Sequence, residues 1–104
     1  MLELRPNCEL CDRDLPADSK DARICTYECT YCVNCVETIL HNVCPTCGGG
    51  FEARPIRPRN AWRPERRLGL NYHPASTVRR HSPFTTDDIQ AHVARIRDLP
   101  PQDR

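Results

Sequence analysis

The sequence predicts a small α+β fold in which cross-links, rather than a large hydrophobic core, hold a few short strands and one short helix together. Two observations favour this class. The chain of 104 residues is only 38% hydrophobic and contains 10 prolines, and small domains this poor in apolar residues usually need metal ions or disulfide bonds. All 8 cysteines lie between Cys8 and Cys47, so the cross-links are expected in the first half of the chain.

Composition and charge divide the chain. We expect a cysteine-rich module over residues 1–52, a Pro/Arg-rich extended segment over residues 53–83 and a C-terminal amphipathic helix over residues 84–99. Residues 1–47 carry four basic and eight acidic side chains, a net charge of −4, whereas residues 48–104 carry eleven arginines and six acids, a net charge of +5. The basic half therefore has an acidic partner within its own molecule.

The spacing of the cysteines predicts two metal sites. Cys8 and Cys11 form one Cys-x-x-Cys knuckle and Cys44 and Cys47 form another; two intervening residues let both sulfurs point at one zinc ion about 2.3 Å away. Four more cysteines stand between them: Cys25, Cys29, Cys32 and Cys35. Eight thiols complete two tetrahedral sites, so we expect two zinc ions. A site closed by four protein ligands is structural, and no catalytic residues are predicted.

The same thiols are expected in a reducing compartment. The first residues contain no apolar run typical of a secretory signal, and no apolar stretch approaches the roughly 20 residues of a membrane span. We therefore expect a cytoplasmic protein without a membrane partner, where paired cysteines hold metal more often than they form disulfides. Disulfide bonds remain the alternative for an exported chain. A thioredoxin-like redox site would need a βαβ context that this stretch cannot supply.

Local patterns predict one strand and one helix within the cysteine-rich half. Residues 22–27 favour a strand that pairs with a short return strand. Asn34 and Glu37 have the spacing of a capping box, which predicts a short helix over residues 35–41. Its apolar face would consist of Val36, Ile39 and Leu40.

The remaining polar residues of this half are given structural interpretations. His41 ends the predicted helix, where it favours the negative helix terminus, and is kept outside the metal sites. Pro6 and Asn7 are expected to form a turn. A solvated loop is expected for the acidic run of Asp12, Asp14, Asp18 and Asp21.

The Pro/Arg-rich segment is expected to be extended. Residues 53–83 contain five prolines and eight arginines against the single acid Glu65, a composition that buries little apolar surface. Trp62 and Tyr72 have two interpretations: they stack on nucleic-acid bases, or they pin the segment to the cysteine-rich half. We favour the second interpretation, because the cysteine-rich half is acidic and has too few apolar residues for a large core of its own. For the same reason we expect no appreciable nucleic-acid binding at physiological salt.

The C-terminal helix has clear signals. Thr85 is the predicted N-cap, with Asp88 at the third helical position, and Pro100 follows the last turn. One apolar stripe results from Ile89, Val93 and Ile96. We expect this stripe to dock on the patch formed by Leu10, Val36, Ile39 and Leu40.

The cysteine pattern resembles a RING finger over residues 8–47. The likeness rests on the first knuckle, on the four central cysteines and on the final Cys-Pro-Thr-Cys at residues 44–47. Leu10 and Ile39 stand where many RING ligases carry apolar residues. Residues 1–16 also resemble a small bacterial family of uncharacterised cysteine-rich proteins, which implies a cytoplasmic protein of unassigned function.

The RING resemblance implies a cross-brace, a ligand pairing that alternates along the chain. One site would then consist of Cys8, Cys11, Cys32 and Cys35, and the other of Cys25, Cys29, Cys44 and Cys47. Spacing alone also permits a sequential pairing, in which Cys25 and Cys29 join the first knuckle.

Three functions follow from these patterns. The first is a non-enzymatic protein-interaction module that binds a partner protein through the surface of helix 35–41 or through the tail. The second is a ubiquitin-ligase-type RING. The third is a nucleic-acid-binding protein acting through its arginines. We rank the ligase below the module, because Gly48 stands where ligases place a ubiquitin-gripping arginine and Ile39 is smaller than the usual tryptophan. The partner and the oligomeric state stay open.

Overall fold

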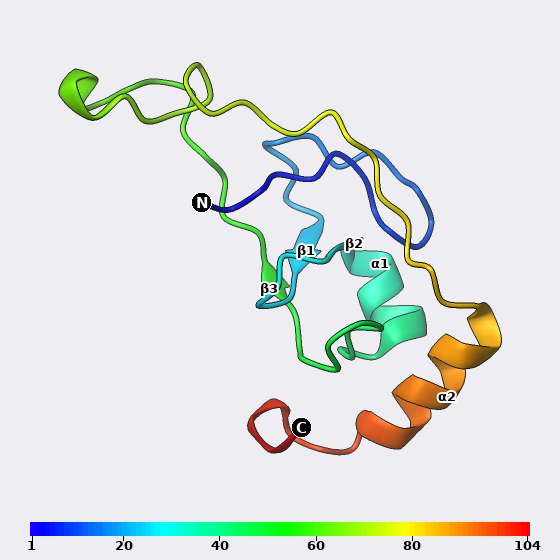
Figure 1. Cartoon of the computed structure of the whole chain (residues 1–104). Coiled ribbons are helices and arrows are strands. Elements are labelled where there is room, and N and C mark those ends of the chain that lie inside the picture. Colours follow the sequence, from blue (N-terminus) through cyan, green and yellow to red (C-terminus); the bar gives the residue numbers. More distant parts are fainter.

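The computed structural model describes all residues, 1–104, and has a three-stranded antiparallel sheet at its centre, in the order β2-β1-β3 (Figure 1). β1 (Ala22–Ile24) pairs with β2 (Thr30–Cys32) on one side and with β3 (Glu52–Ala53) on the other. Arg23 faces Tyr31 of β2 and Ala53 of β3. The short strands expected for an α+β fold are therefore present, and β3 lies across the boundary expected at residue 52.

The first strand is shorter than the predicted range 22–27. It ends at Ile24 because Cys25 begins a tight turn, in which the amide of Glu28 donates to the Cys25 carbonyl at 3.1 Å. Glu28 has a left-handed φ of 68°. The amide of Cys25 also donates to the Cys29 carbonyl at 3.2 Å, so the turn places these two cysteines opposite each other at the end of the hairpin.

The helix of the cysteine-rich half begins directly after β2. It consists of α1 (Val33–Cys35), which continues into the π-helical η1 (Val36–Leu40). The capping box predicted from Asn34 and Glu37 is wrong: the N-cap is Cys32, whose Sγ accepts from the amide of Cys35. The helix therefore begins two residues before the predicted range 35–41 and ends at Leu40, because His41 is left-handed, with a φ of 47°.

The C-terminal helix begins where its capping signals predicted, but it is shorter than the expected range 84–99 and ends at Ile96. α2 (Thr86–Ile96) begins after Thr85, whose hydroxyl accepts from the amide of Asp88 at 3.2 Å. A short 3-10 turn, η3 (Pro101–Asp103), follows. Behind it, the guanidinium of Arg104 donates to the carbonyls of Asn42 and Gly48, which returns the chain end to the cysteine-rich half. None of the helices has the length and apolar character that crossing a membrane requires.

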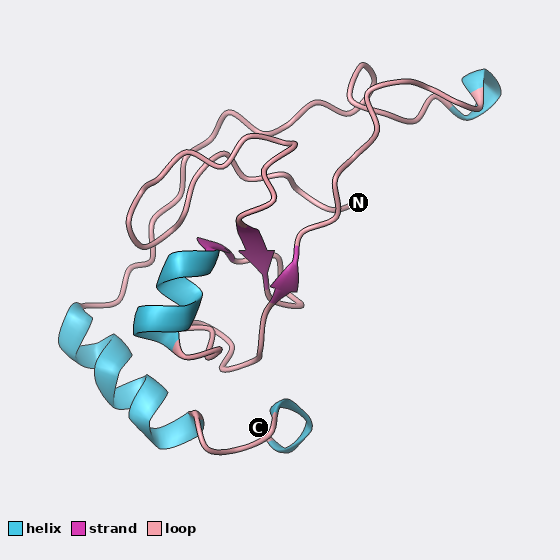
Figure 2. Ribbon diagram, turned by 180° about the vertical axis from the view of Figure 1, so that it is seen from behind, coloured by secondary structure: helices cyan, strands magenta, loops and turns pink.

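The hydrophobic core surrounds the cysteines. The rings of Tyr31 and Phe51 meet edge to face, 5.5 Å apart. Ile89 and Val93 of α2 belong to the same buried cluster as the cysteines, Val36 and Leu40, and α2 lies alongside the α1–η1 helix in Figure 2. The C-terminal helix therefore docks on its own cysteine-rich half, as expected. Within the predicted patch, Leu10 is partly buried, whereas Ile39 stays 43% exposed.

Residues 53–83 are largely extended and return along the N-terminal segment (Figure 1). The amide of Ser76 donates to the Leu4 carbonyl at 3.0 Å, and the amide of Ser82 donates to the Glu9 carbonyl at 2.8 Å. The expectation that Trp62 pins this segment is wrong, because its side chain is 79% exposed. Tyr72 is half exposed and lines a pocket together with Leu2 and Leu4 of the N-terminal segment. Hydrogen bonds and ion pairs of arginines also hold the segment.

Residues 58–70, which we call the arm, project from the rest of the molecule (Figure 1). The amide of Leu70 donates to the Pro58 carbonyl at 2.9 Å and closes the base, while η2 (Pro64–Arg66) turns the chain at the tip. Gly69 is needed at the base, because its φ is +107° and a Cβ there would lie 2.9 Å from the Asn60 carbonyl oxygen. The molecule extends over 48 × 27 × 19 Å.

Candidate metal centres

The first candidate metal centre joins the N-terminal knuckle to the start of the α1–η1 helix. The knuckle is a closed turn, in which the amide of Asp12 donates to the Cys8 carbonyl and the amide of Cys8 donates to the Arg13 carbonyl. The second pair of cysteines lies where β2 ends and α1 follows. The sulfurs of four cysteines all lie within 4.8 Å of one another: Cys8, Cys11, Cys32 and Cys35.

The second candidate centre joins the β1–β2 hairpin to the last knuckle. The amide of Gly48 donates to the Cys44 carbonyl at 2.9 Å, and the amide of Cys44 donates to the Gly49 carbonyl at 2.8 Å. Gly48 has a φ of +78°, a conformation that favours glycine, at the exit of this turn. The sulfurs of three cysteines lie within 4.8 Å of one another: Cys25, Cys44 and Cys47.

Cys29 is the one cysteine outside both groups. It is nevertheless buried, and its thiol lies close enough to Cys25 and Cys44 for these groups to change one another's pKa. The structure therefore brings seven of the eight predicted ligands into two groups and places the eighth beside the second group.

The two groups interleave along the chain. The hairpin cysteine Cys25 lies in sequence between Cys11 and Cys32, which both belong to the first group. The sequential pairing permitted by spacing alone, with Cys25 and Cys8 in one site, is not the arrangement of the sulfurs. All eight cysteines are free of disulfide bonds, so the alternative of a disulfide framework is not the arrangement found either.

Backbone amides point at sulfurs in both groups. The amide of Cys35 donates to Cys32 Sγ at 3.4 Å, the amide of Tyr27 to Cys25 Sγ at 3.4 Å, and the amide of Gly49 to Cys47 Sγ at 3.3 Å. Hydrogen bonds to a thiolate favour its charged form. These turns therefore place backbone N–H donors on three of the cysteine sulfurs.

Burial and crowding act against that charge. Burial raises the pKa of Cys8 and of Cys35, and interaction with the Cys25 and Cys29 thiols raises the pKa of Cys44. The opposite holds for Cys25, whose pKa is lowered by the thiols of Cys29 and Cys44. Several thiolates packed this closely need a compensating cation, and a divalent metal ion bound by sulfur supplies that compensation. Both groups could therefore hold a metal ion.

The other predicted polar residues lie apart from the sulfur groups. His41 belongs to neither group. Part of the acidic run, expected as a solvated loop, makes ion pairs: Arg79 binds Asp12 at 3.0 Å and Asp14 at 2.7 Å, and Arg13 binds Asp21 at 2.9 Å. The acidic loop is therefore a docking surface for arginines.

Two buried residues support the first knuckle: Asn7, which was expected only to form a turn with Pro6, and Glu9, which the sequence analysis did not single out. Asn7 is fully buried, and its amide donates to the Arg80 carbonyl at 2.8 Å. Glu9 is buried, and its carboxylate accepts from the amide of Thr30 and from the guanidinium of Arg5. A polar residue beside a cysteine knuckle carries no local signal of burial, because its partners come from distant segments.

A third such residue is Arg54. It is only 4% exposed, and its guanidinium donates to the carbonyls of Arg5, Leu15 and Pro16. Burial lowers its pKa. Arg54 thereby joins the start of the extended segment to the N-terminal segment.

Comparison with known proteins places these centres within a family. A family model described as "Protein of unknown function (DUF1272)" matches residues 1–57, a range that spans all eight cysteines. An uncharacterized protein of Rhizobium meliloti (strain 1021) is 56% identical over 79 residues, which cover 76% of this chain and 84% of that protein. No solved structure matches the chain.

Proposed function

The chain belongs to the DUF1272 family of unknown function, and for this member we propose the role of a non-enzymatic protein-interaction module held in shape by two structural zinc ions. The observation that carries this proposal is the interleaved pair of sulfur groups. Sulfur-only ligand sets favour zinc among the common divalent ions. Zinc bound there would supply folding free energy that a small core lacks.

The proposed ligand sets form a cross-brace. Cys8, Cys11, Cys32 and Cys35 hold one ion; Cys25, Cys29, Cys44 and Cys47 hold the other. Inclusion of Cys29 is supported by its burial beside Cys25 and Cys44. With four thiolates each, the sites have no position left for water or substrate, so they act as structure.

The proposed partner-binding surface is the exposed side of the α1–η1 helix where it meets α2. Ile39 is a large apolar side chain that remains 43% exposed although its neighbours Val36 and Leu40 are buried. It lines a shallow groove of about 260 Å³ between the two helices, together with Thr38, His41, Gln90, Val93, Ala94 and Arg97. An exposed apolar side chain in a polar rim is the composition expected of a protein contact.

We propose that this surface does not serve a ubiquitin ligase. Gly48 follows the last cysteine, where ligases carry the ubiquitin-gripping arginine. The next arginine along the chain, Arg54, is buried against three carbonyls and cannot reach a partner. Binding of another kind of protein partner in the groove beside Ile39 is therefore better supported than ubiquitin-ligase activity.

Two measurements test the proposed function. Native mass spectrometry of the purified chain should find two zinc ions, and chelation should unfold it; one ion or none would contradict the structural role. Affinity capture from the producing organism should then recover a protein partner with the wild-type chain and with Val78→Glu, but not with Ile39→Glu. Val78 is an exposed aliphatic residue outside the groove, so it controls for the added charge. Equal recovery of the partner by all three chains would rule out the groove as the partner-binding surface.

A further inference from the structure

Residues 53–83 contain eight arginines, which the structure divides into two sets. Four of them fasten the segment to the body. Arg54 and Arg57 donate to backbone carbonyls, while Arg79 and Arg80 pair with carboxylates of the N-terminal segment. The other four are exposed and make no ion pair: Arg59, Arg63, Arg66 and Arg67. The first set makes contacts that hold the fold together, and the second set, which we call the free arginines, makes no ion pair.

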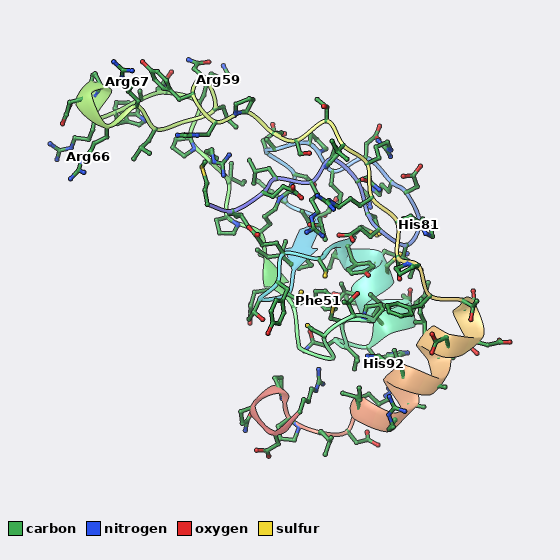
Figure 3. The ribbon with its side chains drawn as sticks, in the orientation of Figure 1. Phe51, Arg59, Arg66, Arg67, His81 and His92 are labelled. Atoms are coloured by element: carbon green, nitrogen blue, oxygen red, sulfur yellow. The ribbon has the colours of Figure 1, made fainter.

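All four free arginines lie on the arm, residues 58–70. Glu65 is the only acidic residue of the arm, which therefore carries a net charge of +3. Figure 3 shows Arg66 and Arg67 at the far end of the arm, directed away from the body. The acidic half was expected to be the partner of the basic half within the molecule. Its ion pairs reach only Arg79 and Arg80 from that segment.

The arm also carries Trp62, the only tryptophan of the chain, which is 79% exposed. The indole follows Arg59 and precedes Arg63 in the same short loop. The hydrogen bond between Leu70 and Pro58 and the positive φ of Gly69 define the shape of this loop. The arm thus holds an exposed aromatic ring among the free guanidinium groups in a defined loop conformation.

We propose that the arm binds single-stranded nucleic acid, with the guanidinium groups on phosphates and Trp62 stacked on a base. Guanidinium groups bind phosphate through paired hydrogen bonds, and exposed aromatic rings are the stacking platforms of single-strand binders. An irregular arm does not fit the duplex major groove as a helix or β-ribbon does. A membrane is the poorer fit, because Glu65 stands at the tip and only Trp62 and Leu68 offer large exposed apolar side chains.

The single tryptophan makes the test direct. Zinc-loaded full-length protein is titrated with a short oligothymidylate at low salt while Trp62 fluorescence is recorded, and we expect quenching that saturates. Four phosphate contacts predict a slope of about −2.8 for log K against log salt, a loss of roughly 50-fold between 50 and 200 mM salt. This slope agrees with the expectation of little binding at physiological salt. No quenching at low salt would overturn the proposal.

Matched variants distinguish binding by the arm from a general effect of positive charge on the protein. The double variant Arg66→Gln/Arg67→Gln should weaken binding at least tenfold. Arg95→Gln/Arg97→Gln, in the last turn and at the C-cap of α2, removes the same charge from exposed positions elsewhere and should change the affinity less than threefold. Equal losses would overturn the proposal. Trp62→Ala, measured by anisotropy of a labelled oligonucleotide, should bind about 5- to 150-fold more weakly; unchanged affinity would contradict stacking.

Two further titrations exclude other acidic partners. Polyglutamate and vesicles containing anionic phospholipid are added to the same wild-type protein under the same low-salt conditions. We expect neither to alter Trp62 fluorescence as strongly as the oligonucleotide. A blue shift with vesicles, or equal quenching with polyglutamate, would assign the arm to a membrane or an acidic protein instead.

Discussion

The side chain of Asn7 and the backbone of Arg80 exchange two hydrogen bonds, although the residues are 73 positions apart. Asn7 Nδ2 donates to the Arg80 carbonyl at 2.8 Å, and the Arg80 amide donates to Asn7 Oδ1 at 3.2 Å. The amide side chain thus pairs with an extended segment as a neighbouring strand would. Because Asn7 directly precedes Cys8, this contact ties the returning segment to the first knuckle.

Replacing Asn7 by alanine should release that segment. The Arg80 amide and carbonyl lose their partner, at a cost of about 1–3 kcal/mol. The amides of Ser76 and Ser82, which bond to the N-terminal segment, should then exchange with solvent roughly 5- to 150-fold faster. Hydrogen exchange measured by NMR tests this. Asn60→Ala, an exposed position on the arm, is the control. Unchanged exchange in Asn7→Ala would show that the segment is held elsewhere.

Substitution of Cys29 should remove one metal ion. Its sulfur lies outside the group of Cys25, Cys44 and Cys47, so this variant decides whether the second site uses four thiolates. We expect Cys29→Ala to retain one zinc ion per chain and His41→Ala to retain two, by native mass spectrometry. The cobalt form should show the same difference in its thiolate absorption. Two tightly held ions in Cys29→Ala would remove Cys29 from the ligand set.

A charge on the buried face of α2 should expose the core. Val93 is 4% exposed and packs with the cysteine core, so Val93→Asp buries an unpaired carboxylate, which is strongly unfavourable. We expect increased binding of a hydrophobic dye, and the same from deletion of residues 84–104. Gln90→Asp puts the same charge on an exposed position of the helix and should leave dye binding unchanged. A deletion variant as soluble and stable as the full chain would contradict the docking of α2.

Loss of the Arg54 guanidinium should lower thermal stability. Arg54→Met keeps the aliphatic stem but leaves the carbonyls of Leu15 and Pro16 without their donor, at a cost of about 1–3 kcal/mol. In a domain of this size the melting temperature should fall by about 5–15 °C. Calorimetry at saturating zinc measures this. The exposed arm variant Arg63→Met should shift it by no more than about 2 °C, and equal melting of the two variants would contradict a structural role for Arg54.

The features that could be predicted from the sequence depend on residues that lie close together along the chain. Thr85 capped α2 as its spacing with Asp88 indicated, because this contact closes within one helical turn. The docking stripe of α2 followed from helical periodicity. The resemblance of the first sixteen residues to a bacterial family of unassigned function agrees with the family match. One sulfur group contains the four cysteines that the RING resemblance implies for one site, and the other contains three of the four that it implies for the second site. Spacing alone did not decide between the two pairings.

The features that escaped prediction depend on partners far away in the chain. Asn34 lost its expected capping role because Cys32, at the end of β2, already serves as the N-cap. Trp62 was expected to pack on the cysteine-rich half, but it lies in the arm, whose base is closed by the hydrogen bond from the Leu70 amide to the Pro58 carbonyl. The division of the arginines into fastened and free sets follows from which carboxylates and carbonyls they reach. Composition gives the number of charged residues but does not tell which groups each of them contacts.

The interleaved sulfur groups also set an order of events during synthesis. Cys8 and Cys11 leave the ribosome first and must wait for Cys35 before their group is complete, and Cys44 and Cys47 complete the other group. The N-terminal segment then stays uncovered until Arg79 and Arg80 arrive. A nascent chain halted before residue 47 would carry an incomplete second group, so the proposed metal ions would have to be delivered while translation proceeds.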